Sequence, residues 1–293
     1  MTPAPVGPSM SYTLVAPATV DEALALARPG SGGTTQILAG GTDLVRDLDD
    51  GRADATLVVS LRRLPWKGIA WDGASVTIGS TRSLRQLELD ADLRARLPGL
   101  HEAIQAVGGV ALRHRATLGG NVARASPASD LLPILLAYDA RARLVSAAGA
   151  RSVPVDELLV GTRNTTLAPG ELIESLTIPR SGPSAYVWQR VRPANDISQV
   201  GLAVARAGDP PTWRVALGGV APRPVRLGSV ERRLGTGRPT TARIDEAGRD
   251  AADHAPFVTD KRATEEYRRF LVTALFRRAA ELVVARAGPG AFA

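Results

Sequence analysis

The stretch RHRATLGGNVARASPASDLLP, residues 113–133, carries a threonine close to a Gly-Gly pair in its TLGGN segment, residues 117–121. A similar combination stands upstream in AGGTDL, residues 39–44, directly after a short apolar run that is typical of a strand. Glycine allows backbone conformations that other residues avoid, so consecutive N–H groups can turn toward an anion. Each stretch therefore predicts an anion-binding loop, although a lone Gly-Gly pair is also typical of a tight turn.

Two such loops in one domain suit a dinucleotide, because its pyrophosphate carries two negative groups. Neither loop matches G-x-G-x-x-G or G-x-x-x-x-G-K-S/T, which disfavours a nicotinamide-type or nucleoside-triphosphate site. Asp130 follows the second loop and is a candidate to accept hydrogen bonds from a ribose or adenine group. It is equally well placed to cap a helix that begins at Leu131.

The composition restricts the chemistry of the whole chain. Its 293 residues correspond to about two domains of roughly 150 residues each. With no cysteine and only three histidines, the chain offers no disulfide, no thiolate, no ligands for an iron–sulfur cluster and no histidine-rich metal site. A redox function would therefore need an organic cofactor. No apolar run approaches the roughly 20 residues that span a bilayer.

The charge pattern disfavours a nucleic-acid partner. The 36 basic and 29 acidic residues give a net charge of +7, but the basic residues come in pairs and aromatic residues make up only 4%. Stacking platforms for single-stranded nucleic acid need more aromatic side chains than this. The first ten residues lack the basic and apolar regions of a secretory signal, which makes the cytoplasm the default location.

Local signals predict an α+β fold in two domains. Residues 1–10 contain three prolines and predict a flexible N-terminal arm. Thr19 and Glu22 form a capping box before a helix at residues 21–28, and Asp72-Gly73 marks a hairpin within residues 69–79. The apolar run at residues 131–137 fits either a buried helix or a strand. A Pro- and Gly-containing break at residues 179–183 separates a domain at 11–180 from one at 181–293.

The second domain predicts an antiparallel meander of three strands, at residues 186–192, 199–207 and 213–218. Helical patterns follow, the longest of them at residues 264–287. The second domain is therefore also α+β.

The two Gly-Gly stretches together resemble the FAD-binding, or medium, subunit of the molybdenum hydroxylases, the family of xanthine dehydrogenase and aerobic carbon monoxide dehydrogenase. The resemblance continues in order through most of the chain, from about residue 12 to residue 287. Further matching segments are GELI at residues 170–173, NDIS at 195–198, LGGVAP at 217–222 and EEYR at 265–268.

The resemblance implies an FAD-binding domain of the PCMH type, with the two α+β subdomains shared with vanillyl-alcohol oxidase, at residues 11–180. A small α+β domain like the C-terminal domain of the carbon monoxide dehydrogenase flavoprotein follows at 181–293. The family's two Gly-Gly loops hold the FAD pyrophosphate, and the resemblance implies neither a catalytic side chain nor a metal ligand in this chain. Carried over residue by residue, the cofactor-binding residues are Ile37, Leu38, Ala39, Gly40, Gly41, Thr42, Asp43, Leu44, Val107, Thr117, Gly119, Gly120, Asn121, Asp130 and Ile173.

One position departs from the family's pattern. Trp188 stands where the family commonly has a lysine, and it either packs on FAD or fills the core. Relatives with covalent FAD attach it to His or Cys, and no matching residue exists here, so FAD is expected to be non-covalent. His114, between Arg113 and Arg115, is expected to have a surface or subunit-contact role rather than an acid–base role.

The function implied by the resemblance is electron transfer within a heteromer. FAD here would receive electrons from 2Fe-2S clusters on a small subunit, while a large subunit carries molybdopterin and the substrate. The acceptor would be NAD, oxygen or a quinone, and the assembly a dimer of heterotrimers. Two alternatives remain open from the residues: a stand-alone MurB-like flavin reductase and a non-enzymatic basic binding module. The substrate cannot be predicted from this chain.

Overall fold

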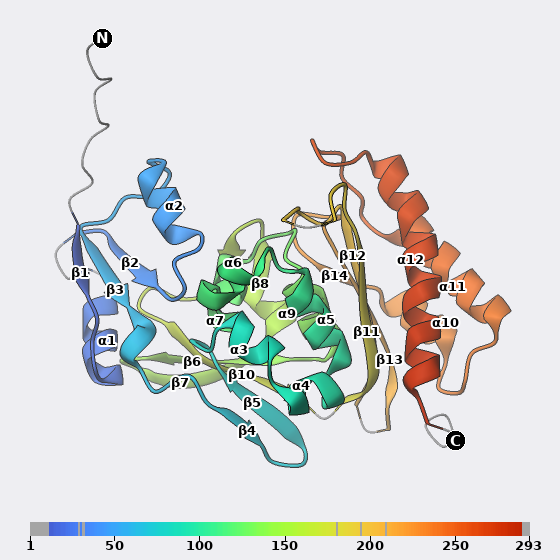
Figure 1. Ribbon diagram of the computed structural model, residues 1–293, viewed down its shortest axis with the longest axis horizontal. Coiled ribbons are helices and arrows are strands. Elements are labelled where there is room, and N and C mark those ends of the chain that lie inside the picture. The colour runs from blue at the N-terminus through green and yellow to red at the C-terminus, as the bar shows by residue number, and fades with distance from the viewer. Residues whose placement is uncertain are drawn as a thin grey trace, which may run out of the picture.

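The computed structural model describes residues 12–28, 30, 33–179, 181–193, 195–208 and 210–288. The predicted arm at residues 1–10 lies outside the described residues. Three groups of elements follow one another along the long axis of the molecule, from the blue N-terminal strands through the green central helices to the red C-terminal helices (Figure 1). The α+β class expected from the sequence is confirmed.

The N-terminal group is a small parallel sheet with two helices. Its strands lie in the order β1-β3-β2, and β3 pairs with both neighbours in parallel. Helix α1 begins after Thr19, whose side chain accepts a hydrogen bond from the Glu22 N–H at 3.2 Å, so the predicted capping box is confirmed. The elements are β1 (Thr13–Val15), α1 (Val20–Ala27), β2 (Thr35–Leu38), α2 (Leu44–Asp49), β3 (Leu57–Ser60) and η1 (Leu61–Arg63).

The central group combines an antiparallel five-stranded sheet with a layer of short helices. The sheet order is β4-β5-β10-β6-β7, and the β4–β5 pair turns at the predicted Asp72-Gly73 hairpin. The strands are β4 (Ile69–Trp71), β5 (Ser75–Gly79), β6 (Arg141–Ser146), β7 (Gly149–Pro154) and β10 (Leu172–Pro179), with a small pair β8 (Leu159–Gly161) and β9 (Asn164–Thr165). The helices are α3 (Leu84–Glu88), α4 (Ala91–Arg96), α5 (Pro98–Ala106), α6 (Val110–Arg115), α7 (Leu118–Arg124), α8 (Leu131–Ala137) and α9 (Val155–Leu158).

Helix α8 resolves the ambiguity of the apolar run at residues 131–137. Every residue of α8 is buried, because α5 and α7 pack against it on the central side and β12 and β13 on the other. A helix that is covered on all sides carries no polar face, so its sequence shows no helical periodicity. This burial explains why the pattern alone fits either a helix or a strand.

The C-terminal group is an antiparallel sheet between two helical layers. It contains β11 (Ser181–Gln189), β12 (Val200–Ala207), β13 (Thr212–Gly218) and β14 (Val225–Arg226), in that order. The predicted three strands are present, and the prediction of only three is wrong because β14 pairs with β13 at the edge. A strand of two residues is too short to show alternation. Helices α10 (Gly228–Leu234), α11 (Thr241–His254) and α12 (Glu265–Arg286) stand on the side of this sheet away from α5 (Figure 1).

Among the described helices, none combines the length and the apolar character that crossing a bilayer requires. The predicted division of the chain falls between β10 and β11, at the join of the central and C-terminal groups.

Candidate functional site

A cavity of about 300 Å³ lies between the N-terminal group and α7, and both Gly-Gly stretches line it. Figure 1 shows α2 in the blue N-terminal group and α7 among the green central helices. Twelve of the predicted cofactor-binding residues line the cavity: Ile37, Ala39, Gly40, Gly41, Thr42, Asp43, Leu44, Thr117, Gly119, Gly120, Asn121 and Ile173. Leu38, Val107 and Asp130 do not line it.

The first loop, residues 39–44, joins β2 to α2 and exposes its backbone donors. Gly41 has φ +79°, a left-handed conformation that glycine adopts without strain. In the described part of the chain, no hydrogen bond uses the N–H groups of residues 40–43. Consecutive free N–H groups beside a positive φ form a concave anion site. The prediction of an anion-binding loop therefore has a physical basis here.

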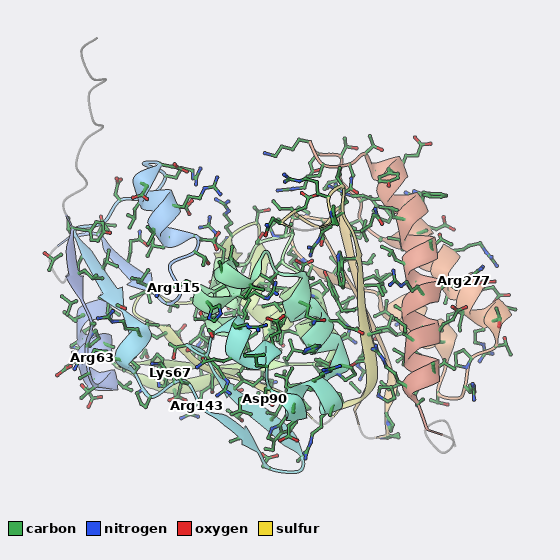
Figure 2. All side chains as sticks on the ribbon, viewed as in Figure 1. Arg63, Lys67, Asp90, Arg115, Arg143 and Arg277 are labelled. Carbon is green, nitrogen blue, oxygen red and sulfur yellow. The ribbon has the colours of Figure 1, made fainter. Side chains whose placement is uncertain are left out.

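The first loop also touches the chain just before the second loop. A Cβ atom at Gly40 would overlap with the backbone carbonyl of Arg115, and it would lie 3.1 Å from the Ala116 Cα. Only glycine fits at such a close approach of two backbones. Figure 2 shows Arg115 where α6 meets the N-terminal group.

The second loop, residues 117–121, is the first turn of α7, and its backbone donors are already used. The Gly119 N–H donates to Ser80 O at 2.9 Å, and the Gly120 N–H donates to Thr117 Oγ1 at 3.1 Å. The Asn121 N–H donates to Thr117 O at 3.0 Å. The prediction of a second backbone nest is therefore wrong, because Thr117 accepts two of these N–H groups and Ser80 accepts the third.

Side-chain groups replace the missing backbone donors on this side of the cavity. Thr117 Oγ1 accepts from Gly120, which leaves its O–H to donate elsewhere. Ser80, at the end of β5, is only 3% exposed, and its Oγ has no hydrogen-bond partner among the described residues. A buried hydroxyl without a partner is costly unless a ligand or water completes it. Ser80 lines the cavity, and the sequence offered no signal that singled it out.

An ion-pair cluster holds α2 against α7 at the cavity wall. Arg124 contacts the carboxylate of Asp47 at 2.6 Å and that of Asp43 at 3.3 Å. Hydrogen bonds from Arg124 and Arg52 keep the pKa of Asp47 below its usual range, against the opposing effect of burial. The cluster therefore links α2, which follows the first Gly-Gly stretch, to α7, which contains the second. Arg124 lines the cavity but was not predicted.

A second pair fixes the rim of the cavity next to β10. Arg151 donates two hydrogen bonds to the Glu171 carboxylate, at 2.6 and 2.7 Å. The hydrogen bond from Arg151 keeps the pKa of Glu171 below its usual range. The Ala168 N–H also donates to this carboxylate, at 2.8 Å. The rim that leads to the cavity residues Leu172 and Ile173 is thus held by a charged pair.

Asp130 lies away from the cavity, in a buried network with the C-terminal sheet. Its Oδ1 accepts from Tyr186 Oη at 2.8 Å and from Ser198 Oγ at 2.5 Å, and Arg190 reaches Oδ2 at 3.3 Å. Burial raises the pKa of Asp130 and also that of Tyr186. The Asp130 side chain also makes no capping hydrogen bond to α8. The capping role is therefore not filled by this carboxylate, and its polar contact to the nucleotide stays a prediction.

Trp188 and Val107 both belong to the packing of the central core. Trp188 is partly buried against this core and stacks on Tyr186, with ring centroids 5.8 Å apart and an interplanar angle of 18°. The core alternative for Trp188 therefore accounts for its contacts. Val107 packs against the same core, and His114 is exposed on α6.

These features fit a dinucleotide cofactor. The free N–H groups of the first loop suit its pyrophosphate, and the Gly40 contact brings both loops to one cavity. The unpartnered Ser80 hydroxyl gives an independent sign that a polar ligand belongs against this wall.

Comparison with protein families also indicates a dinucleotide cofactor, namely FAD. The family described as "FAD binding domain in molybdopterin dehydrogenase" matches residues 10–181. This chain belongs to the FAD-binding subunits of the molybdenum hydroxylases. In these flavoprotein subunits a second domain follows, and "CO dehydrogenase flavoprotein C-terminal domain" matches residues 185–283.

Individual relatives of this molybdenum hydroxylase subunit align with it over most of its length. The "Carbon monoxide dehydrogenase medium chain" of Hydrogenophaga pseudoflava is 30% identical over 81% of this chain and 84% of its own. The "Xanthine dehydrogenase FAD-binding subunit" of Escherichia coli O157:H7 is 30% identical over 86% of this chain and 90% of its own. A solved carbon monoxide dehydrogenase from H. pseudoflava superposes with a TM-score of 0.87 at 28% identity, covering 94% of this chain and 98% of that chain. The chain is thus an oxidoreductase subunit with an FAD-binding domain.

Proposed function

We propose that this chain is the electron-transfer subunit of a heteromeric molybdenum-containing hydroxylase or dehydrogenase. It receives electrons from 2Fe-2S clusters on a small partner subunit and passes them to NAD, oxygen or a quinone. The observation that carries the proposal is the free N–H nest of residues 40–43, which faces a cavity in a chain without cysteine. Such a chain can hold a dinucleotide but offers no thiolates to an iron–sulfur cluster.

The residues of the cavity divide the work of holding FAD. The nest of residues 40–43 binds the pyrophosphate through backbone N–H groups, and Thr117 and Ser80 donate from the α7 side. Arg124 and its two carboxylates keep α2 and α7 in contact around the cofactor. Bound FAD supplies a carrier that exchanges one or two electrons at a time, and the protein positions and tunes it.

Several properties of the assembly follow from the proposal. FAD is non-covalent, because the chain has no cysteine and none of its three histidines lines the cavity. Molybdopterin and the hydroxylated substrate belong to a large partner subunit, and the complex is a dimer of heterotrimers in the cytoplasm. Names such as "medium chain" and "FAD-binding subunit" among the relatives support the presence of partners.

Purification of the chain alone and with its co-purifying proteins tests the proposal. We expect the visible absorption bands of oxidised flavin, released intact by denaturation, and partners that carry iron–sulfur clusters and molybdenum. A flavoprotein that purifies without partners and oxidises a reduced nicotinamide would instead be a stand-alone reductase. A chain that binds no flavin, alone or with partners, would contradict the proposal.

A further inference from the structure

Ser129 lies outside the cavity but contacts both α7, which lines the cavity, and the start of α8. It is 7% exposed and sits at the end of the loop between α7 and α8. Its Oγ is 3.2 Å from the Leu131 N, 3.3 Å from the Leu132 N and 2.6 Å from Asn121 Oδ1. Ser129, and not Asp130, therefore caps helix α8.

The direction of each hydrogen bond at Ser129 follows from its partners. Backbone N–H groups can only donate, so Leu131 and Leu132 occupy the two acceptor positions of the hydroxyl oxygen. The single hydroxyl proton must then go to Asn121. An amide nitrogen cannot accept it, so the atom that faces Ser129 is the carbonyl oxygen Oδ1. The amide N and O atoms of asparagine have nearly the same size and shape, so the hydrogen bond from Ser129 determines which of them faces it.

The amide nitrogen of Asn121 is consequently free for the cavity. Asn121 lines the cavity, and its Nδ2 makes no hydrogen bond among the described residues. Asn121 also stands four residues after Thr117, so both side chains lie on one face of the first turn of α7. That face presents one O–H donor and two amide N–H donors, where the backbone presents none.

We propose that Ser129 is a positioning residue that orients the Asn121 amide with its N–H groups toward the anionic oxygens of the dinucleotide. The inference rests on the proposed function, because it assumes FAD in the cavity. Without the Ser129 hydroxyl the amide can rotate, and its carbonyl oxygen would then meet the phosphate with the wrong polarity. The second loop thus contributes to binding through a side chain that a residue beyond the cavity holds in place.

A double-mutant cycle on the full-length chain tests the coupling. The four proteins are the native chain, Ser129→Ala, Asn121→Ala and the double variant, each stripped of flavin and titrated with FAD. We expect Ser129→Ala to weaken FAD binding about tenfold in the native background and less than about twofold in the Asn121→Ala background. Equal losses in both backgrounds would show that Ser129 acts only by capping α8, which overturns the proposal.

Ser126→Ala serves as the matched control. Ser126 lies three residues earlier in the same loop, and its side chain makes no hydrogen bond among the described residues. We expect its FAD affinity to equal that of the native chain. A loss equal to that of Ser129→Ala would mean that any change in this loop has the same effect, which also overturns the proposal.

Ser129→Thr and Ser129→Val keep the test decisive if Ser129→Ala does not fold. These variants have the same shape and differ by one hydroxyl group. The Thr variant is expected to bind FAD about tenfold more tightly than the Val variant, and only when Asn121 is present. A native chain that binds no FAD would refute the proposed function itself. A native chain that binds FAD, with Thr and Val variants of equal affinity, would refute only the role of Ser129.

Discussion

The two Gly-Gly loops look alike in sequence and differ in chemistry. In the first loop the N–H groups of residues 40–43 are free, whereas in the second loop the corresponding groups are bonded to Ser80 and Thr117. The reason is position: the first pair precedes α2 in a left-handed turn at Gly41, and the second pair lies inside the first turn of α7. One loop can therefore offer backbone donors to a phosphate, and the other serves mainly to bring a helix close to β5.

Gly40→Ala should have the largest effect, because it separates the two loops. The new Cβ would overlap with the backbone carbonyl of Arg115, which no side-chain rotation relieves. We expect loss of about 3 kcal/mol in the free energy of unfolding and loss of bound flavin. Chemical denaturation and the flavin-to-protein absorbance ratio measure the two effects. Gly68→Ala is the control, since nothing lies within 4 Å of a Cβ there. Flavin retained in full by Gly40→Ala would show that FAD binding does not need the contact between the two loops.

Gly41→Ala should weaken FAD binding by about tenfold, through distortion of the nest. An alanine held at φ +79° lowers the free energy of unfolding by about 1–2 kcal/mol, unless the backbone of the turn rearranges to avoid this conformation. Gly73→Ala is a matched control, because Gly73 has φ +83° at the tip of the β4–β5 hairpin and does not line the cavity. Both variants should lose similar stability, and only the Gly41 variant should lose FAD affinity. Equal FAD affinity in the two variants would contradict the role of the first loop.

Asp47→Asn should weaken FAD binding by about fivefold at neutral pH, because it removes the negative charge from the 2.6 Å ion pair that joins α2 to α7. The pKa of Asp47 is lowered in the folded chain, so its contribution is complete above the ordinary value of 3.8 and is lost as the pH falls below it. FAD titrations between pH 3 and 7, roughly the range over which a carboxyl group titrates, check this. The native chain should lose affinity at the acidic end more steeply than the variant. Parallel pH profiles for the two proteins would exclude Asp47 as the source.

Gly120→Ala should have the smallest effect, because the backbone N–H groups of the second loop are already bonded within the chain. Its Cβ would lie 2.8 Å from Thr117 Oγ1, the end of a side chain that can move, and Gly120 does not have a positive φ. Alanine also favours the helix by about 1 kcal/mol, which offsets the crowding. We expect less than a threefold change in FAD affinity, roughly 0.7 kcal/mol, in the same titration. A loss as large as that of Gly41→Ala would mean that the second loop also binds through its backbone.

Local signals in the sequence predicted most of the fold. The capping box at Thr19, the Asp72-Gly73 hairpin and the strands of the C-terminal sheet depend on residues within a few positions of one another. The loop at residues 39–44 was also predicted, since a Gly-Gly pair after a strand restricts the backbone directly. Helix α8 remained ambiguous because burial on all sides removes periodicity.

The parts that sequence reasoning missed depend on contacts between distant segments. Asp130 was a candidate helix cap, but its carboxylate instead binds Tyr186 and Ser198, which are 56 and 68 residues away in the chain. Ser80 and Arg124 show no distinctive pattern in sequence, and only the packing of β5 and α7 brings them to the cavity wall. The hydrogen bond from the Gly119 N–H to Ser80 could likewise not be predicted, because it depends on where β5 places Ser80.

The contact at Gly40 also limits how the protein can change over time. Its neighbour is a main-chain carbonyl, which is present whatever amino acid occupies position 115. A second substitution at that position therefore cannot restore the space that a side chain at position 40 removes. In a genetic selection for restored flavin binding, Gly40→Ala should therefore revert to glycine or shift a whole segment.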